Sequence, residues 1–169
     1  MKSHVKLLII AGLVLGGALG MAGTFVSSDQ LRSLLWAIDG TGLIVATSLL
    51  AVRFLHAGED CVAGGFIVYA IGEAVMLGGT AGSLEASVPT FAAGTALWTA
   101  ALLLTSVPKV FAIWTRIAAL IAAILFGFVS LRIFAGAEIT PLTKPLPFAA
   151  YPFLVLTFVG WIWSTVKAE

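Results

Sequence analysis

The chain has 169 residues, of which 60% are hydrophobic and only 10% are charged, whereas an ordinary soluble domain carries roughly 25% charged residues. A water-soluble protein of this length cannot bury so much apolar surface, so lipid is the expected solvent for most of the chain. The formal net charge is +1, which leaves no basic field for nucleic acid. The single cysteine, Cys61, excludes an internal disulfide framework. No Cys and His cluster indicates a structural metal site, and no cofactor is indicated.

Six apolar runs, separated by short polar or proline-bearing connections, predict six transmembrane helices. Each run is close to the ~20 residues that a helix needs to cross ~30 Å of hydrocarbon, and none shows the alternation of barrel strands. The expected fold class is an all-α integral membrane protein, a compact bundle in one domain without an extramembrane domain. The predicted helices cover residues 7–26, 34–55, 61–83, 90–106, 110–134 and 147–166.

Two of these runs leave alternatives open. The run 90–106 is the shortest and is rich in Ala, Gly and Thr, so five spans are the alternative to six. The run 7–26 follows Lys2 and Lys6 and ends in small residues, as a secretion signal does. Its apolar core of about 20 residues exceeds the ~7 to 15 of a signal peptide, so we interpret it as a retained span.

The distribution of Lys and Arg predicts that both termini lie in the cytoplasm. Six basic residues fall on the side of the termini and three on the other side, in agreement with the positive-inside rule. The six are Lys2, Lys6, Arg53, Lys109, Arg116 and Lys167, and the three are Arg32, Arg132 and Lys144. Aromatic residues near the predicted helix ends are expected at the headgroup level: Trp36, Trp114, Tyr151, Trp161 and Trp163. The expected location is a bacterial cytoplasmic membrane.

Glu73 is the first candidate for function, because it lies about 12 residues, or ~18 Å, from the start of its predicted helix and so near the bilayer midplane. An isolated carboxylate there costs at least roughly 2.5 to 3.5 kcal/mol. No Lys or Arg is expected at its depth, so Glu73 is expected to be neutral or to face a water-filled cavity. Its expected partners at similar depth are Tyr69, Thr95, Trp98 and Thr99. Two interpretations stay open: a site that titrates protons or binds a cation, and a protonated group that only fastens two helices.

Asp39 is the second ionisable group inside a predicted span, about five residues from the outer end of the helix 34–55. Arg132 is expected at comparable depth, and an ion pair between the two would stabilise both charges. The alternative is that the two groups reach the interface separately. Gly40 and Gly42 follow Asp39, and such a pair permits the local unwinding that transporters use.

A glycine groove is predicted on the first helix, where Gly12, Gly16 and Gly20 recur at four-residue spacing. Small residues at this spacing let two helix backbones approach closely. The groove serves either the fold itself or an interface in a homo-oligomer.

The sequence indicates a class of function rather than a reaction. It has no intramembrane Ser and His pair, no acidic cluster for a metal and no Gly-rich phosphate loop, so a non-enzymatic role is favoured over catalysis. One hypothesis is a permease or channel for an ion, a proton or a small solute, with Glu73 as the key group and Asp39, Thr80, Thr95 and Thr99 lining the path. The alternative is a non-catalytic accessory subunit of a larger membrane complex.

Overall fold

The computed structural model describes residues 2–80 and 82–167, and over these residues the protein folds into six α-helices and one short 3₁₀ helix. The helices are α1 (Ser3–Gly23), α2 (Asp29–His56), α3 (Asp60–Gly79), α4 (Val88–Ser106), α5 (Ile113–Phe134), η1 (Phe148–Ala150) and α6 (Tyr151–Lys167). Six segments are long and apolar enough to cross a membrane, with η1 and α6 counting as one. The predicted six spans are therefore confirmed against the alternative of five, and the protein is a polytopic membrane protein.

Several helix ends differ from the prediction by three to five residues, and two of these differences change the positions of the acidic residues within their helices. The helix α2 begins at Asp29 rather than at residue 34, because the Ser28 hydroxyl caps it by accepting a hydrogen bond from the Leu31 backbone N–H at 3.3 Å. Asp39 consequently lies ten residues, or ~15 Å, inside its helix. The helix α3 ends at Gly79 rather than at residue 83, so Glu73 lies six residues, or ~9 Å, from its end. The two carboxylates are therefore closer in depth than the predicted helices imply.

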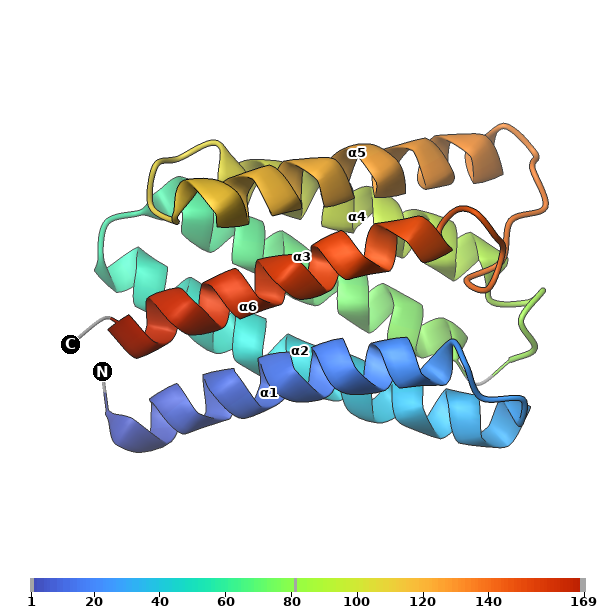
Figure 1. Cartoon of the computed structure of the whole chain (residues 1–169), viewed down its shortest axis with the longest axis horizontal. Helices are drawn as coiled ribbons and strands as arrows, with labels where there is room; N and C mark the ends of the chain where they lie inside the picture. The colour runs from blue at the N-terminus through green and yellow to red at the C-terminus, as the bar shows by residue number, and fades with distance from the viewer. Residues whose placement is uncertain (1, 81, 168–169) are drawn as a thin grey trace.

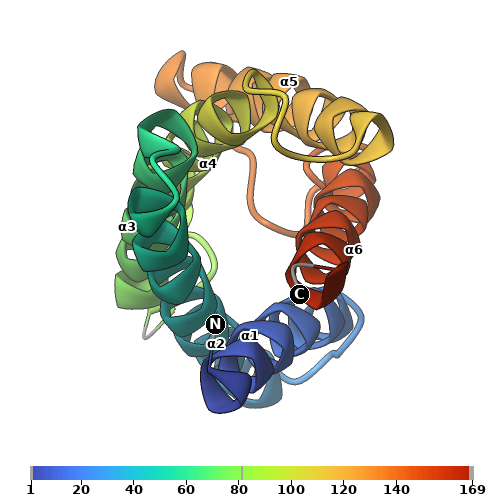
Figure 2. The ribbon, with the colours of Figure 1, turned by 90° about the vertical axis from the view of Figure 1, so that its left-hand side faces the viewer.

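The helices form a closed ring in chain order. Each helix packs against the next one along the chain, and α6 packs against α1 to complete the ring, as Figure 2 shows in a view down the bundle. Consecutive helices are antiparallel, so the two chain ends lie at one end of the bundle (Figure 1). We call this the terminal end. The opposite end, which we call the loop end, carries the connections 24–28, 82–87 and 135–147.

The seam between α1 and α2 depends on the predicted glycines. A Cβ atom on Gly12 would fall against the backbone oxygen of Gly42, and a Cβ atom on Gly16 would overlap the Leu43 side chain. The glycines thus allow the two backbones to approach closely, as small residues do in membrane bundles. In this structure α2 fills the groove at Gly12 and Gly16, as expected if the groove serves the fold.

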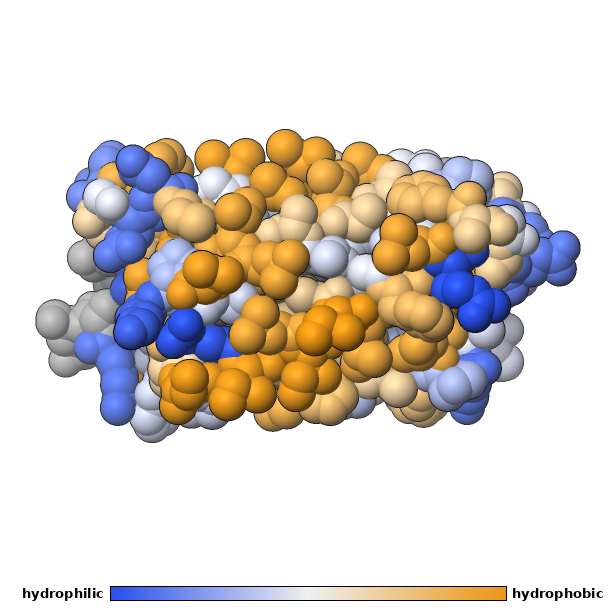
Figure 3. All heavy atoms as spheres, turned by 90° about the horizontal axis from the view of Figure 1, so that it is seen from above, coloured by the Kyte–Doolittle hydropathy of each residue, from blue (hydrophilic) through white to orange (hydrophobic). Residues whose placement is uncertain are grey.

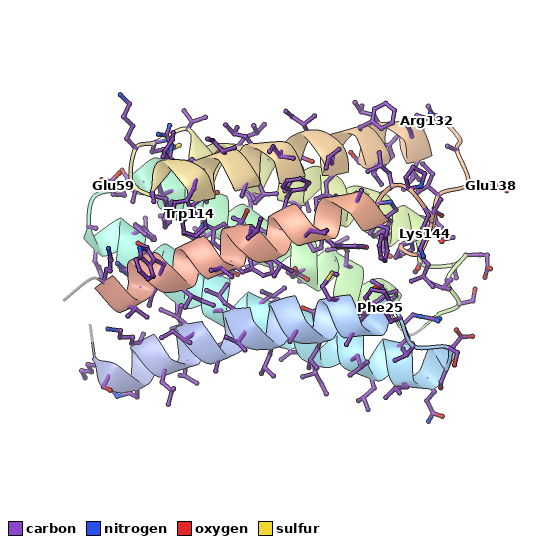
Figure 4. All side chains as sticks on the ribbon, in the orientation of Figure 1. Phe25, Glu59, Trp114, Arg132, Glu138 and Lys144 are labelled. Atoms are coloured by element: carbon purple, nitrogen blue, oxygen red, sulfur yellow. The ribbon has the colours of Figure 1, made fainter. Side chains whose placement is uncertain are left out.

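The outer surface has the pattern expected of a membrane-spanning bundle. A broad hydrophobic belt covers the middle of the face seen in Figure 3, and hydrophilic residues gather at both ends. Figure 4 places Arg132, Glu138 and Lys144 at the loop end and Glu59 at the terminal end. The antiparallel arrangement puts the six predicted inner basic residues at the terminal end. Which end faces the cytoplasm stays a prediction.

Four aromatic side chains fill the ring in its terminal half. Phe54 of α2, Phe66 of α3, Phe111 of the connection 107–112 and Trp161 of α6 are each at most 6% exposed. The ring centroids of Phe54 and Phe66 are 5.5 Å apart, and those of Phe66 and Trp161 are 4.8 Å apart. We call these four residues the aromatic plug. Trp161, predicted near the headgroup level, is buried inside the bundle, where its side chain is 1% exposed.

Candidate functional site

A cavity of about 150 Å³ lies inside the ring in its loop-end half. Its lining comes from α1, α2, α3, α4 and α6 and from the connections at the loop end. Gly82 and Ser83, which are exposed, belong to its mouth, while Glu73 and Trp98 belong to its inner part. The aromatic plug fills the ring between the inner part and the terminal end. The exposed lining residues Gly82 and Ser83 thus lie at the loop end, and the aromatic plug lies on the opposite side of the cavity.

Glu73 and Asp39 both line this cavity, and glycines on the facing helices make room for them. Glu73 projects from α3 toward α2, where its Oε2 lies 3.6 Å from the place of a Cβ atom on Gly40. Asp39 projects from α2 toward α1, where its Oδ2 lies 2.8 Å from the place of a Cβ atom on Gly20. Asp39 is close enough for the two carboxylates to repel each other when both are ionised. The helix seams thus bring together two acidic groups that are 34 positions apart in the sequence.

Polar atoms without partners gather around the two carboxylates. Tyr69, one turn before Glu73, stacks on Trp98 of α4 with 5.6 Å between ring centroids and 7° between planes. The Tyr69 hydroxyl and the Trp98 indole N–H are directed at the Glu73 carboxyl, but neither reaches it with full hydrogen-bond geometry. Among the described residues no partner bonds Asp39 Oδ1, Tyr69 Oη, Glu73 Oε1 or Trp98 Nε1. Each such buried group costs roughly 1 to 3 kcal/mol, so this cluster is suited to a polar or charged occupant.

The charges along the cavity favour a positive occupant. Its charged lining residues are Asp29, Arg32, Asp39 and Glu73. Arg32, at the mouth, pairs with Asp29 and donates a second hydrogen bond to the Val26 carbonyl at 2.7 Å. This leaves the two deeper carboxylates without a cationic partner among the described residues. A buried carboxylate without such a partner is expensive in its charged form, so an entering cation or proton would relieve the cost.

The structure brings some of the predicted site residues together and separates others. Glu73, Asp39 and Trp98 line the same cavity, Tyr69 stacks on Trp98 beside them, and Thr80 lines the cavity farther out. Thr95 is fully buried and bonds the Phe91 carbonyl of its own helix. Thr99 bonds the Thr95 and Ala123 carbonyls and packs against Gly127 of α5. Thr95 and Thr99 are not among the residues that line the cavity.

The predicted ion pair between Asp39 and Arg132 is not formed. The helices α2 and α5 make no contact because two helices separate them on each side of the ring. Arg132 is exposed and lies over the Phe128 ring at 5.8 Å from the centroid. The local unwinding that Gly40 and Gly42 would permit is not observed either, since α2 is one continuous helix from Asp29 to His56.

The cavity also uses residues that the sequence analysis assigned elsewhere. Trp36 and Tyr151, predicted at the headgroup level, line the cavity together with the buried Arg32. The sequence did contain a pattern that indicates some of the lining residues. One face of a single helix carries residues spaced three or four positions apart: Arg32, Trp36, Asp39 and Leu43. Tyr151 offered no such signal, since its position depends on how α6 closes the ring.

Comparison with protein-family models, with curated proteins and with solved structures gives no significant match. Among the described residues, no group of three or more His, Cys, Asp and Glu side chains lies together as a metal ion would require. The chemistry of the site therefore has to be derived from the two carboxylates and their aromatic surroundings.

Proposed function

We propose that the protein is a small permease that takes up a proton or a small cation from the loop end, with Glu73 as the principal binding group and Asp39 as the second. The observation that carries the proposal is the position of this carboxylate pair in a cavity whose exposed lining residues lie at one end of the bundle. Ionisable groups inside a membrane bundle mark pathways for ions and protons in many membrane proteins.

The charge balance supports uptake of a positive species. Glu73 is 4% exposed and has no cationic partner among the described residues. Binding of a proton or a cation would neutralise one carboxylate and relieve its repulsion by the other. Burying the occupied site then costs less free energy than burying two ionised carboxylates. This lower cost is required if the bound ion is to be enclosed away from water during transport.

The aromatic plug favours a permease over a permanently open channel. Phe54, Phe66, Phe111 and Trp161 occupy the ring between the carboxylates and the terminal end. Tyr69 connects the two regions, because its ring lies 5.7 Å from that of Trp161 and its hydroxyl is directed at Glu73. Passage to the terminal end requires these aromatic side chains to rearrange, as expected for a protein that opens to one side at a time.

Flux across reconstituted vesicles tests the proposal. The purified protein is reconstituted into liposomes, and the dissipation of a pH gradient or of a cation gradient across the membrane is followed with an entrapped dye. Glu73→Gln keeps the shape of the side chain but cannot carry a charge, so it should abolish the protein-dependent flux, and Asp39→Asn should reduce it. Glu138→Gln is the matched control, because Glu138 is exposed in the connection 135–147 at the same end of the bundle. Equal flux through the Glu73→Gln and wild-type proteins would refute the proposal.

A further inference from the structure

The walls of the cavity identify the kind of cation that fits it. Resting on the function proposed above, we infer that the occupant is a compact organic ammonium ion, held by Glu73 and Asp39 on one side and by aromatic rings on the other. The inference depends on four features of the cavity: its acceptors, its aromatic lining residues, the bonding of its other oxygen atoms and its size.

The acceptors suit a group that donates hydrogen bonds and carries a positive charge. Glu73 Oε1 and Asp39 Oδ1 are buried and have no partner among the described residues. A protonated amine brings up to three N–H donors and one charge, which suits acceptors of this kind. Such charge-assisted hydrogen bonds are roughly twice as strong as neutral ones.

Aromatic side chains form part of the cavity wall. Five of the lining residues are aromatic and come from three helices: Trp36, Phe91, Trp98, Tyr151 and Phe158. The Trp36 indole is fixed in place, because its Nε1 donates a hydrogen bond to the Gly20 carbonyl at 3.3 Å. Aromatic faces attract cations, and sites for organic ammonium ions use them in this way.

Apart from the carboxylates, the side-chain oxygens of the lining belong to hydroxyl groups, and those of Thr80, Ser87 and Thr90 already donate to backbone carbonyls nearby in the sequence. Calcium takes six to eight oxygen ligands, and potassium filters replace the hydration shell with backbone carbonyls. Here α2 and α3 are unbroken helices, so their carbonyls beside the carboxylates are engaged within the helices. The Thr80 hydroxyl, farther out, donates to the Leu77 carbonyl at 2.8 Å. Two carboxylates alone do not replace the hydration shell of an alkali ion.

The size of the cavity limits the occupant. A volume of about 150 Å³ equals that of an engineered cavity known to bind benzene. The space suits an ammonium ion with a short alkyl or a single-ring substituent. Longer polyamines would not fit without widening the mouth near Asp29 and Arg32.

An isosteric pair of probes tests the inference. The tert-butylammonium ion and tert-butanol have nearly the same shape, but only the first carries a charge. Their binding to the full chain in detergent is measured by isothermal titration calorimetry, with tryptophan fluorescence as a second readout. We expect saturable binding of tert-butylammonium that is at least roughly tenfold tighter than binding of tert-butanol. Sodium or potassium chloride at equal ionic strength should not displace it.

Three variants locate the binding. Glu73→Gln should weaken tert-butylammonium binding by roughly tenfold or more, and Trp98→Leu should weaken it by about threefold or more through loss of an aromatic face. Glu138→Gln should leave it unchanged. Each variant is first compared with the wild type by size-exclusion chromatography and circular dichroism. Because Trp98 packs on Tyr69, a Trp98→Leu protein that fails this comparison is replaced by Trp98→Phe, which keeps an aromatic ring and should retain binding within about threefold.

The outcomes separate this inference from the proposed function. Displacement of tert-butylammonium by sodium or potassium at similar concentrations would overturn the organic cation and leave the cation site standing. Absence of saturable amine binding, together with proton flux that still depends on Glu73, would also overturn the inference alone. Flux that is equal in the wild type and in Glu73→Gln would refute the proposed function and the inference with it.

Discussion

Replacing Gly12 with Ala should force α1 and α2 apart at the centre of their seam. The added Cβ atom would fall against the Gly42 carbonyl oxygen and would lie 2.8 Å from the Ala46 Cβ. Ordinary contact begins at 3.4 Å, and neither neighbour can turn away, because one is a backbone atom and the other is fixed to the backbone. The two helices must therefore separate by at least 0.6 Å at this point.

The cost of this separation follows from comparison with a glycine that meets nothing. Forcing an extra methyl group into a well-packed interface costs about 1 to 3 kcal/mol. Against this, Ala is more favourable than Gly in a helix interior by about 1 kcal/mol. Gly64 of α3 provides the matched control, since a Cβ atom there has no neighbour within 4 Å. Gly64→Ala should show only the gain in helix propensity. The difference in the free energy of unfolding between Gly64→Ala and Gly12→Ala therefore equals the packing cost of about 1 to 3 kcal/mol.

Reversible unfolding in mixed detergent micelles measures the two free energies. The fraction of denaturing detergent is raised, and the loss of helix is followed by circular dichroism with tryptophan fluorescence as a second probe. Gly16→Ala should fall between the two variants, because the atoms it meets belong to the Leu43 side chain, which can rotate. If Gly12→Ala unfolds at the same detergent fraction as Gly64→Ala, α1 and α2 do not pack through this groove.

Three further predictions concern the site, the orientation and the plug. Gly40→Ala should not lower the free energy of unfolding, because the nearest atoms lie 3.6 Å or more from the new Cβ. It should weaken tert-butylammonium binding, because the new methyl group covers the Glu73 carboxyl. A wild-type affinity measured by calorimetry would contradict this prediction. If the termini are cytoplasmic, a membrane-impermeant maleimide should label the exposed Cys61 in inside-out vesicles only. The same reagent should label a Cys61→Ala, Glu138→Cys variant in right-side-out vesicles only. The reverse pattern would place the loop end in the cytoplasm. Phe66→Leu, which thins the plug, should raise the flux through vesicles in a protein of unchanged helix content, and unchanged flux would argue against the plug as a barrier.

The sequence was sufficient to predict the parts of the fold that depend on local composition. The apolar runs predicted six spans because a lipid-facing helix must be apolar over most of its length, whatever it packs against. The proximity of Glu73 to Tyr69 and Trp98 followed from helix geometry and from the short connection between neighbouring helices. These inferences needed only one helix, or two that are adjacent in the chain.

Features that depend on distant contacts could not be predicted in this way. The ion pair of Asp39 with Arg132 was expected from similar depth alone, but ring closure places α2 and α5 apart. Trp161 follows the pattern of a headgroup aromatic, yet it completes a buried cluster with residues of α2, α3 and the connection 107–112. Depth in the membrane can be read along a helix, whereas the direction in which a side chain faces depends on the order of the helices around the ring.

The glycine repeat of α1 shows how one pattern can have two physical roles. Gly12 and Gly16 face a carbonyl oxygen and a leucine side chain of α2, so their missing side chains let the helices pack. Gly20, one turn farther on, faces the Asp39 carboxylate, with Oδ2 only 2.8 Å from the place of a Cβ atom. A side chain at Gly20 would push Asp39 away from α1, whereas a side chain at Gly12 would push the backbones apart. The spacing is the same at all three positions, so only the partner on α2 distinguishes a glycine that the fold requires from one that the carboxylate site requires.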